Sequence, residues 1–226
     1  KEAELWHPDT GAMEPAAYSI ENNLTTVPLQ LAERQSVFVV FRNLTLEASR
    51  KLPQQVKTTI ATIEGPWDVR FPPDMGGPDK IQMPELQSWT KHSDNGVKYF
   101  GGTATYTKTI QAQQSWFTSE SKMILDLNTV KDIAEIAVNG KQIGTLWKPP
   151  YQLDITNALK PGENKLEIKV TNQWTNRIAG DRIVPQEERV LSRGGGLGGF
   201  GFGGRGGNLA ESGLIGPVRL VSVINR

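Results

Sequence analysis

The stretch Ile133-Ala-Glu-Ile-Ala-Val-Asn-Gly-Lys-Gln-Ile-Gly-Thr-Leu146 decides the fold class of this chain. It places Asn139-Gly140 between two runs, 133–138 and 141–146, in which apolar and polar residues alternate. A two-residue type I′ turn needs positive φ at both central residues, and Asn-Gly meets this need at low cost. The stretch therefore predicts a β-hairpin.

Further strands are predicted on both sides of this hairpin. Residues 102–110 alternate, and 165–171 places Leu166, Ile168 and Val170 on one face. Shorter candidate strands cover 56–63, 67–71, 122–127, 152–156 and 218–224. Residues 72–98, which are rich in Gly and Pro, are expected to form a loop. Many short strands without helical periodicity are typical of an all-β sandwich or barrel.

The domain prediction divides the chain near residue 50. Residues 1–50 are expected to be a short β segment that ends a preceding domain, and 51–226 the main β domain. Within the first part, 27–31 alternates, and the apolar run Ser36-Val-Phe-Val-Val-Phe41 predicts a strand buried on both faces. Ten of the fourteen residues in 194–207 are Gly, which predicts an irregular surface loop.

Composition excludes several classes of function. The chain has no cysteine, so disulfides, thiol nucleophiles and Cys-ligated metals are excluded. Its formal net charge of +1 provides no overall field toward nucleic acid, and no nucleic-acid partner is expected. No apolar run approaches the roughly 20 residues that span a bilayer, so no membrane span is expected.

The sequence predicts no catalytic centre within the chain. The G-x-G-x-x-G match at 199–204 has neither the preceding strand nor the following helix that phosphate binding needs. The only two histidines, His7 and His92, accompany no serine-elbow or zinc motif. Asp74 and Asp79 could supply oxygen ligands to a structural Ca²⁺, but their spacing fits no defined calcium loop, so no cofactor is expected.

Two aromatic stretches predict a carbohydrate-binding surface. Trp147 is followed by Tyr151, and Trp174 by Asn176 and Arg177, each in a predicted loop at a strand end. Indole faces stack on sugar rings while neighbouring polar groups bond to hydroxyls, so these five residues are the predicted sugar contacts. The alternative is that the indoles pack against the core or a neighbouring domain, which is the more common role of large apolar side chains.

The sequence resembles two groups of glycoside hydrolase. Residues 138–147, 150–156 and 159–172 are similar to the sugar-binding jelly roll of family 2 glycoside hydrolases, which has a galactose-binding-like fold. A wider set resembles the C-terminal region of family 106 α-L-rhamnosidases; it comprises 6–11, 26–29, 36–42, 65–67, 98–106, 174–177 and 212–220.

This resemblance implies a galactose-binding-like jelly-roll β-sandwich within 51–226. It also implies a non-catalytic accessory module of a larger glycoside hydrolase, an α-L-rhamnosidase acting on plant-type polysaccharides or glycosides. Its partner would be a catalytic barrel upstream of Lys1 in the same polypeptide, and its location the bacterial periplasm or exterior. A stand-alone carbohydrate-binding or adhesin-like β domain is the alternative.

Overall fold

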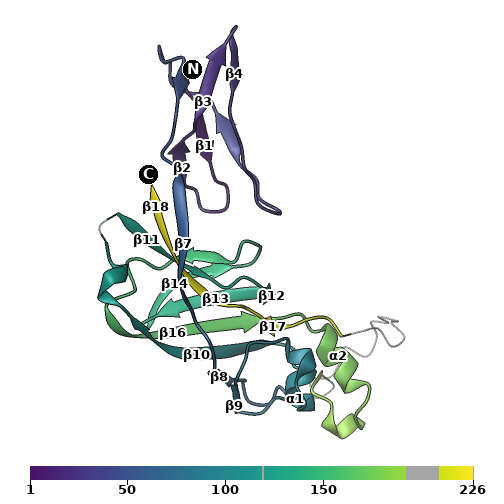
Figure 1. Ribbon diagram of the computed structural model, residues 1–226. Helices are drawn as coiled ribbons and strands as arrows, with labels where there is room; N and C mark the ends of the chain where they lie inside the picture. Colours follow the sequence, from purple (N-terminus) through teal and green to yellow (C-terminus); the bar gives the residue numbers. More distant parts are fainter. Residues whose placement is uncertain (119, 192–208, 226) are drawn as a thin grey trace. The chain divides into compact units, whose positions relative to one another are not determined.

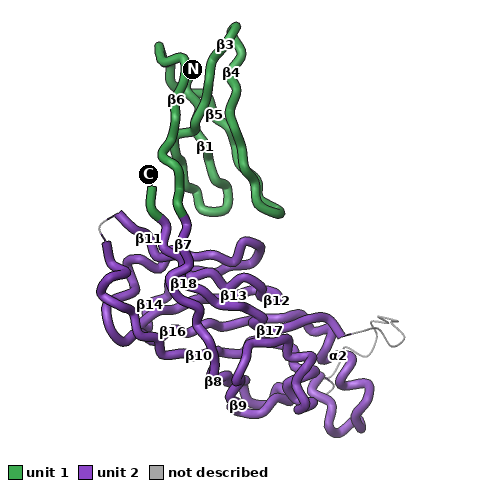
Figure 2. Tube along the Cα trace, in the orientation of Figure 1, with its two compact units in different colours: residues 1–56, 224–226 green, residues 57–223 purple. Residues whose placement is uncertain are grey.

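The computed structural model describes residues 1–118, 120–191 and 209–225 (Figure 1). The chain forms two compact units (Figure 2). Unit 1 comprises Lys1–Val56 with Ile224–Arg226, and unit 2 comprises Lys57–Val223. The prediction for 194–207 lies outside the described residues.

Unit 2 contains a six-stranded antiparallel sheet. Its strands are β8 (Trp67–Arg70), β9 (Lys80–Met83), β10 (Thr103–Ala112), β13 (Ile133–Val138), β14 (Lys141–Leu146) and β16 (Gly162–Thr171). They lie in the order β14-β13-β16-β10-β8-β9, with antiparallel pairing at each step.

A second, four-stranded sheet completes the sandwich. It contains β7 (Gln55–Thr62), β11 (Ser121–Asp126), β15 (Gln152–Asp154) and β18 (Arg219–Asn225), in the order β15-β11-β18-β7. Two short strands, β12 (Val130–Lys131) and β17 (Gly213–Leu214), pair separately.

One hydrophobic core joins the two sheets. Tyr106 and Ile168 of the larger sheet and Leu125 and Leu220 of the smaller belong to the same buried cluster. The alternation predicted for 165–171 is confirmed, because Leu166, Ile168 and Val170 are all buried. The predicted all-β sandwich is therefore correct.

The hairpin at Asn139-Gly140 is also confirmed. Both residues have positive φ, 53° and 79°, as a type I′ turn requires. The Asn139 amide donates to the carbonyl oxygen of Ala158 and to Oδ1 of Asn164, at 3.0 and 2.8 Å. The side chain therefore ties the turn to the neighbouring connection as well as shaping it.

The expectation that 72–98 is a loop was wrong in part. The segment contains β9, the 3₁₀ turn η1 (Trp89–Lys91) and the short helix α1 (Asn95–Lys98). Asp94 caps α1 by accepting a hydrogen bond from Gly96 N at 2.7 Å. Trp89 is fully buried, and its Nε1 donates to the Tyr106 hydroxyl at 2.5 Å. Apolar contacts and a helix cap thus give this segment regular structure, which its Gly and Pro content did not predict.

The remaining helical elements of unit 2 are short. They are η2 (Gln114–Trp116), α2 (Thr175–Asp181) and η3 (Gln186–Glu188). Within the described residues, no helix is long and apolar enough to cross a bilayer.

Unit 1 consists of two three-stranded sheets. Its strands are β1 (Glu4–Trp6), β2 (Met13–Pro15), β3 (Tyr18–Glu21), β4 (Leu24–Thr26), β5 (Phe38–Val40) and β6 (Ser49–Arg50). The sheet orders are β2-β1-β5 and β4-β3-β6. Among the described residues of this unit, the buried core contains only Ala3, Ala16 and Tyr18.

Two predictions for unit 1 were wrong. Residues 27–31 form no strand, although they alternate. The apolar run at 36–41 contains β5, but β5 is an edge strand and Phe38 is 62% exposed rather than buried. Val39 of this strand packs against the small core of unit 1, but Phe38 beside it is exposed. The hydrophobicity of the run therefore gave a misleading prediction of burial on both faces.

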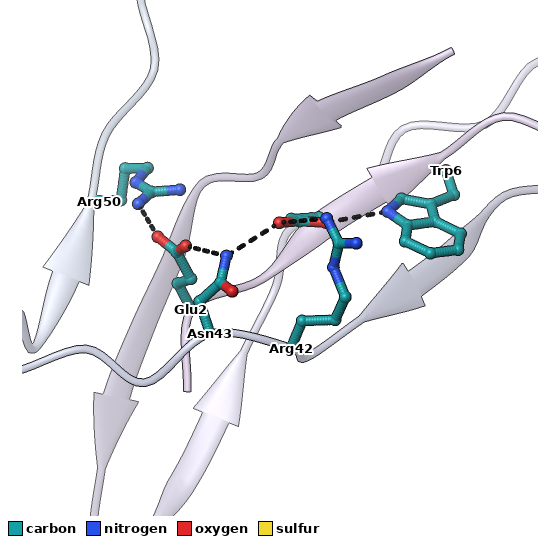
Figure 3. Close-up of polar contacts among 6 residues, drawn as sticks. Glu2, Trp6, Arg42, Asn43 and Arg50 are labelled. Atoms are coloured by element: carbon teal, nitrogen blue, oxygen red, sulfur yellow. Dashed lines mark hydrogen bonds and ion pairs between the residues drawn. The ribbon is translucent and has the colours of Figure 1, made fainter. Parts of the chain in front are cut away.

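A chain of polar contacts connects distant segments of unit 1 (Figure 3). Glu2 accepts hydrogen bonds from Asn43 Nδ2, at 2.8 Å, and from Arg50. Glu4 accepts from Arg42 Nη2 at 3.1 Å and from the Trp6 indole at 2.9 Å. The hydrogen bonds from Asn43 and then Arg50 lower the pKa of Glu2. These contacts hold the first strand against residues 42–50.

Candidate carbohydrate-binding site

The register of the larger sheet brings the two predicted aromatic stretches to one end. Ala134 pairs with Leu146, and Ile133 pairs with Thr171. The end of β14 and the end of β16 therefore flank the start of β13. Trp147 directly follows β14, and Trp174 lies three residues beyond β16, so both indoles emerge at the same sheet end.

A polar cavity of about 260 Å³ opens at this end, and we call it the end-of-sheet cavity. It is formed by three segments that are distant in sequence, within 131–132, 172–176 and 210–212. Its lining residues are Lys131, Asp132, Asn172, Gln173, Thr175, Asn176, Ala210, Glu211 and Ser212. Amide, hydroxyl and charged groups offer both donors and acceptors, which is the combination that sugar hydroxyls require.

Asn176 holds two walls of the end-of-sheet cavity together. Its side chain donates to the carbonyl oxygen of Ala210 at 2.7 Å and accepts from the Ala210 N–H at 2.9 Å. The residue is buried on α2, which begins directly after Trp174. Because both amide groups of Asn176 are used in this way, its main structural role is to fix residues 210–212 beside α2.

Arg177 is buried and does not line the cavity. Its guanidinium forms an ion pair with Asp181 at 2.8 Å, one helical turn further along α2. Asp181 also accepts hydrogen bonds from the backbone N–H groups of Val190 and Leu191. Arg177 therefore anchors α2 to the following segment, and a direct sugar contact by this residue stays a prediction.

Tyr151 supports another wall of the cavity. The ring is buried, and its hydroxyl donates to the carbonyl oxygen of Asp132 at 2.8 Å. Since Asp132 lines the cavity, Tyr151 orients this wall from behind. Like Arg177, it is placed to position the site, and its predicted contact with sugar stays a prediction.

The two indoles are the exposed members of the predicted set. Trp147 is 61% exposed and Trp174 is 45% exposed. The Lys148 ammonium lies 5.6 Å from the centre of the Trp147 ring. Neither indole is among the lining residues of the end-of-sheet cavity, but both follow strands that end at the same end of the larger sheet. Large exposed aromatic faces are suited to stacking on the apolar face of a sugar ring.

Sequence reasoning missed most of the cavity lining. Lys131, Asp132 and Gln173 gave no signal, because none belongs to a recognisable motif. Ser212 begins the stretch 212–220 that carried the resemblance, so it could have been connected to the site. For the residues described, no group of three or more His, Asp or Glu side chains is arranged to hold a metal ion.

Comparison with known proteins finds similarity to glycoside hydrolases in the part of unit 2 that includes α2. Residues 87–192 match the sequence family described as glycosyl hydrolase 2 galactose-binding domain-like. A protein from Formosa agariphila, described as "Putative beta-glucuronidase", is 50% identical over 123 residues, which are 54% of this chain and 11% of that protein.

A solved rhamnosidase from Novosphingobium sp. PP1Y is similar over nearly the whole chain. The alignment has a TM-score of 0.84 and 38% identity, and it covers 98% of this chain and 20% of the rhamnosidase. The chain therefore spans only a small part of either relative. Residues 87–192 of the sandwich are thus similar to the glycosyl hydrolase 2 galactose-binding domain-like family, and the predicted galactose-binding-like β-sandwich fold is confirmed.

Proposed function

We propose that this chain is a non-catalytic accessory module of a larger, secreted or periplasmic glycoside hydrolase that acts on α-L-rhamnosides of plant-type glycosides or polysaccharides. The observation that carries the proposal is the 38% identity to a rhamnosidase over 98% of this chain, which is only 20% of that enzyme. The catalytic barrel belongs to another part of the same polypeptide in this proposal.

The surface of unit 1 supports a place within a larger protein. Large apolar side chains such as Phe38, Leu44 and Leu46 are exposed there, at 62%, 87% and 106%. An excess of exposed large apolar side chains is expected where one domain packs on another, because such an interface is uncovered when the neighbouring domain is absent. In the proposal, the catalytic part of the polypeptide packs on this surface.

The end-of-sheet cavity supports a role in holding carbohydrate. Trp147 and Trp174 would stack on sugar rings, while Gln173 and Glu211 of the lining would bond to hydroxyls. Tyr151, Asn176 and Arg177 would keep these groups in place. The module would thus hold substrate near the catalytic part of the enzyme.

The first test measures hydrolysis of an aryl α-L-rhamnoside by the purified chain and by the complete enzyme. We expect turnover from the complete enzyme alone. Turnover by the purified chain that survives further purification would disprove the non-catalytic role. No turnover of any rhamnoside by the complete enzyme would disprove the substrate class.

The second test measures glycan binding by calorimetry. We expect Trp147→Ala and Trp174→Ala each to weaken binding about 2- to 12-fold, because aromatic stacking contributes about 0.5–1.5 kcal/mol. Ile183→Ala is the matched control, since Ile183 is an exposed apolar residue of unit 2 that lies beyond α2 and is not one of the two indoles that follow β14 and β16. Equal effects from all three variants would exclude the end-of-sheet cavity as the site.

A further inference from the structure

Unit 2 contains a second cavity, of about 500 Å³, which we call the turn cavity. It lies between the turn that joins β7 to β8, residues 84–86 and residues 215–218, and it shares no lining residue with the end-of-sheet cavity. Its volume is within the range of about 300–1,000 Å³ that is usual for small-molecule sites.

The wall of the turn cavity is held in place by close backbone packing. A Cβ atom on Gly65 would lie 1.7 Å from the carbonyl oxygen of Pro84, so only glycine allows this approach. The Ile63 N–H donates to the carbonyl oxygen of Val218 at 2.8 Å. The three segments therefore pack closely against one another at this point.

The lining of the turn cavity combines apolar walls with one unused donor. Leu86, Ile215 and Pro217 contribute apolar surface. Trp67 also lines the cavity, and its buried Nε1–H has no hydrogen-bond partner among the described residues. Buried N–H groups nearly always have an acceptor, so an oxygen atom of a ligand that enters the cavity would satisfy this one.

The charged groups of the turn cavity are both acidic. Glu64 and Glu85 line it with exposed side chains, and no Lys, Arg or His is among the lining residues. Across the described part of the chain, no hydrogen bond or ion pair engages either carboxylate. Carboxylates accept hydrogen bonds from hydroxyl groups and repel other anions.

We propose that the turn cavity binds a neutral saccharide and discriminates against uronic acids. The apolar face of a pyranose ring would pack on Leu86 and Pro217, one ring or hydroxyl oxygen would accept from Trp67, and other hydroxyls would donate to Glu64 and Glu85. Hydroxyls suit this lining because they both donate and accept. The choice of carbohydrate rests on the proposed function, whereas the preference for neutral over acidic ligands rests on the two carboxylates.

The test follows the indole N–H signal of Trp67 by ¹H–¹⁵N NMR on the full chain of 226 residues. The ligands are methyl α-L-rhamnopyranoside and sodium glucuronate, and Trp67→Phe assigns the signal. We expect the rhamnoside to shift this signal saturably, and glucuronate to bind about fivefold more weakly, which corresponds to about 1 kcal/mol of repulsion between charges 4 Å apart in water. If Trp67→Phe does not fold, triple-resonance experiments on the unmodified chain give the assignment.

Substitutions then separate this cavity from the first one. The double variant Glu64→Gln with Glu85→Gln should abolish the preference against glucuronate, while Glu163→Gln, which changes an exposed carboxylate outside the lining, should preserve it. Trp147→Ala should leave the Trp67 shift unchanged, because Trp147 is not part of this cavity.

The outcomes distinguish failure of this inference from failure of the proposed function. A Trp67 signal that neither ligand moves, or that glucuronate moves as readily as the rhamnoside, overturns the turn cavity as a neutral-sugar site. Loss of binding only on Trp147→Ala and Trp174→Ala would retain the end-of-sheet cavity and reject the turn cavity. If the ligand shifts the Trp67 signal and neither of those two variants affects binding, the turn cavity would be retained and the end-of-sheet cavity rejected.

Discussion

Units 1 and 2 are both built from antiparallel strands, but they bury their apolar residues very differently. Unit 2 encloses one core between two sheets, with Tyr106, Ile136 and Ile168 fully buried. Of the part of unit 1 that the structure describes, only Ala3, Ala16 and Tyr18 are buried. Of the fourteen large apolar side chains that are exposed in the described part of the chain, all but Ile133, Trp147, Trp174 and Ile183 belong to unit 1.

The difference teaches that strand content alone does not make a self-sufficient domain. Stability of a small unit depends on how much apolar surface it removes from water, and unit 1 removes little by itself. Polar contacts such as those of Glu2 and Glu4 supply part of the stability that the small core does not provide. Unit 1 is therefore the part of this chain that depends most on its surroundings.

A matched pair of truncations tests this comparison most strongly. Ile168→Ala in unit 2 should lower the free energy of unfolding by about 2–5 kcal/mol, because it leaves a cavity in a close-packed core. Leu46→Ala in unit 1 should change it by less than about 0.5 kcal/mol, since Leu46 contributes no buried surface. Urea unfolding followed by circular dichroism measures both. A comparable loss from Leu46→Ala would show that unit 1 buries this residue in solution.

Two buried tyrosines provide the second pair. The Tyr106 hydroxyl accepts from Trp89 Nε1 and from the Leu214 N–H, at 2.5 and 3.1 Å, and burial raises the pKa of this phenol. Tyr106→Phe would leave two buried donors unpaired, so we expect a loss of about 1–3 kcal/mol in unfolding free energy.

The corresponding change in unit 1 should have no such cost. The Tyr18 hydroxyl is buried without a hydrogen-bond partner among the described residues. Tyr18→Phe removes an unpaired polar group, so it should be neutral or slightly stabilising. The same urea titration compares the two variants, and a loss on Tyr18→Phe that equals the loss on Tyr106→Phe would contradict the assigned contacts.

The sequence predicted unit 2 well because its strands have one buried and one exposed face. Leu166, Ile168 and Val170 share the buried face of β16, and a period of two residues reports this arrangement directly. The turn at Asn139-Gly140 could be predicted just as directly, because few residues tolerate its backbone angles. Unit 1 offered a similar turn signal at Asn22-Asn23, where both residues have positive φ and join β3 to β4, and this signal was missed.

The candidate site could be predicted only in part. Trp147 and Trp174 were identified as exposed aromatics, but hydrophobicity does not reveal which polar side chains gather around them. The end-of-sheet cavity takes Lys131, Gln173 and Glu211 from segments whose proximity depends on strand register and on α2. The buried roles of Tyr151 and Arg177 likewise depend on partners, Asp132 and Asp181, that only the folded chain brings within reach.

The smallest expected difference between the two units is in how their stability responds to acid. Hydrogen bonds from Asn43 and Arg50 lower the pKa of Glu2 in unit 1, and those from Lys80 and Gln82 lower the pKa of Asp68 in unit 2. A carboxyl whose folded pKa is lowered stabilises the fold above its unfolded pKa, and this contribution disappears as the pH falls through the folded pKa. Both units should therefore lose a little stability below the usual carboxyl range.

Glu2→Gln and Asp68→Asn assign this loss to each unit separately. The indole N–H signals of Trp6 and Trp67 report on units 1 and 2, so urea titrations at neutral and acidic pH can be followed by NMR for both at once. Glu2→Gln should flatten the pH dependence at Trp6 and leave that at Trp67 unchanged, and Asp68→Asn should do the opposite. Because unit 1 has the smaller core, we expect the loss of stability caused by Glu2→Gln to be the larger fraction of its unit's stability. If Glu2→Gln left the pH dependence at Trp6 unchanged, the polar contacts of Figure 3 would not stabilise unit 1.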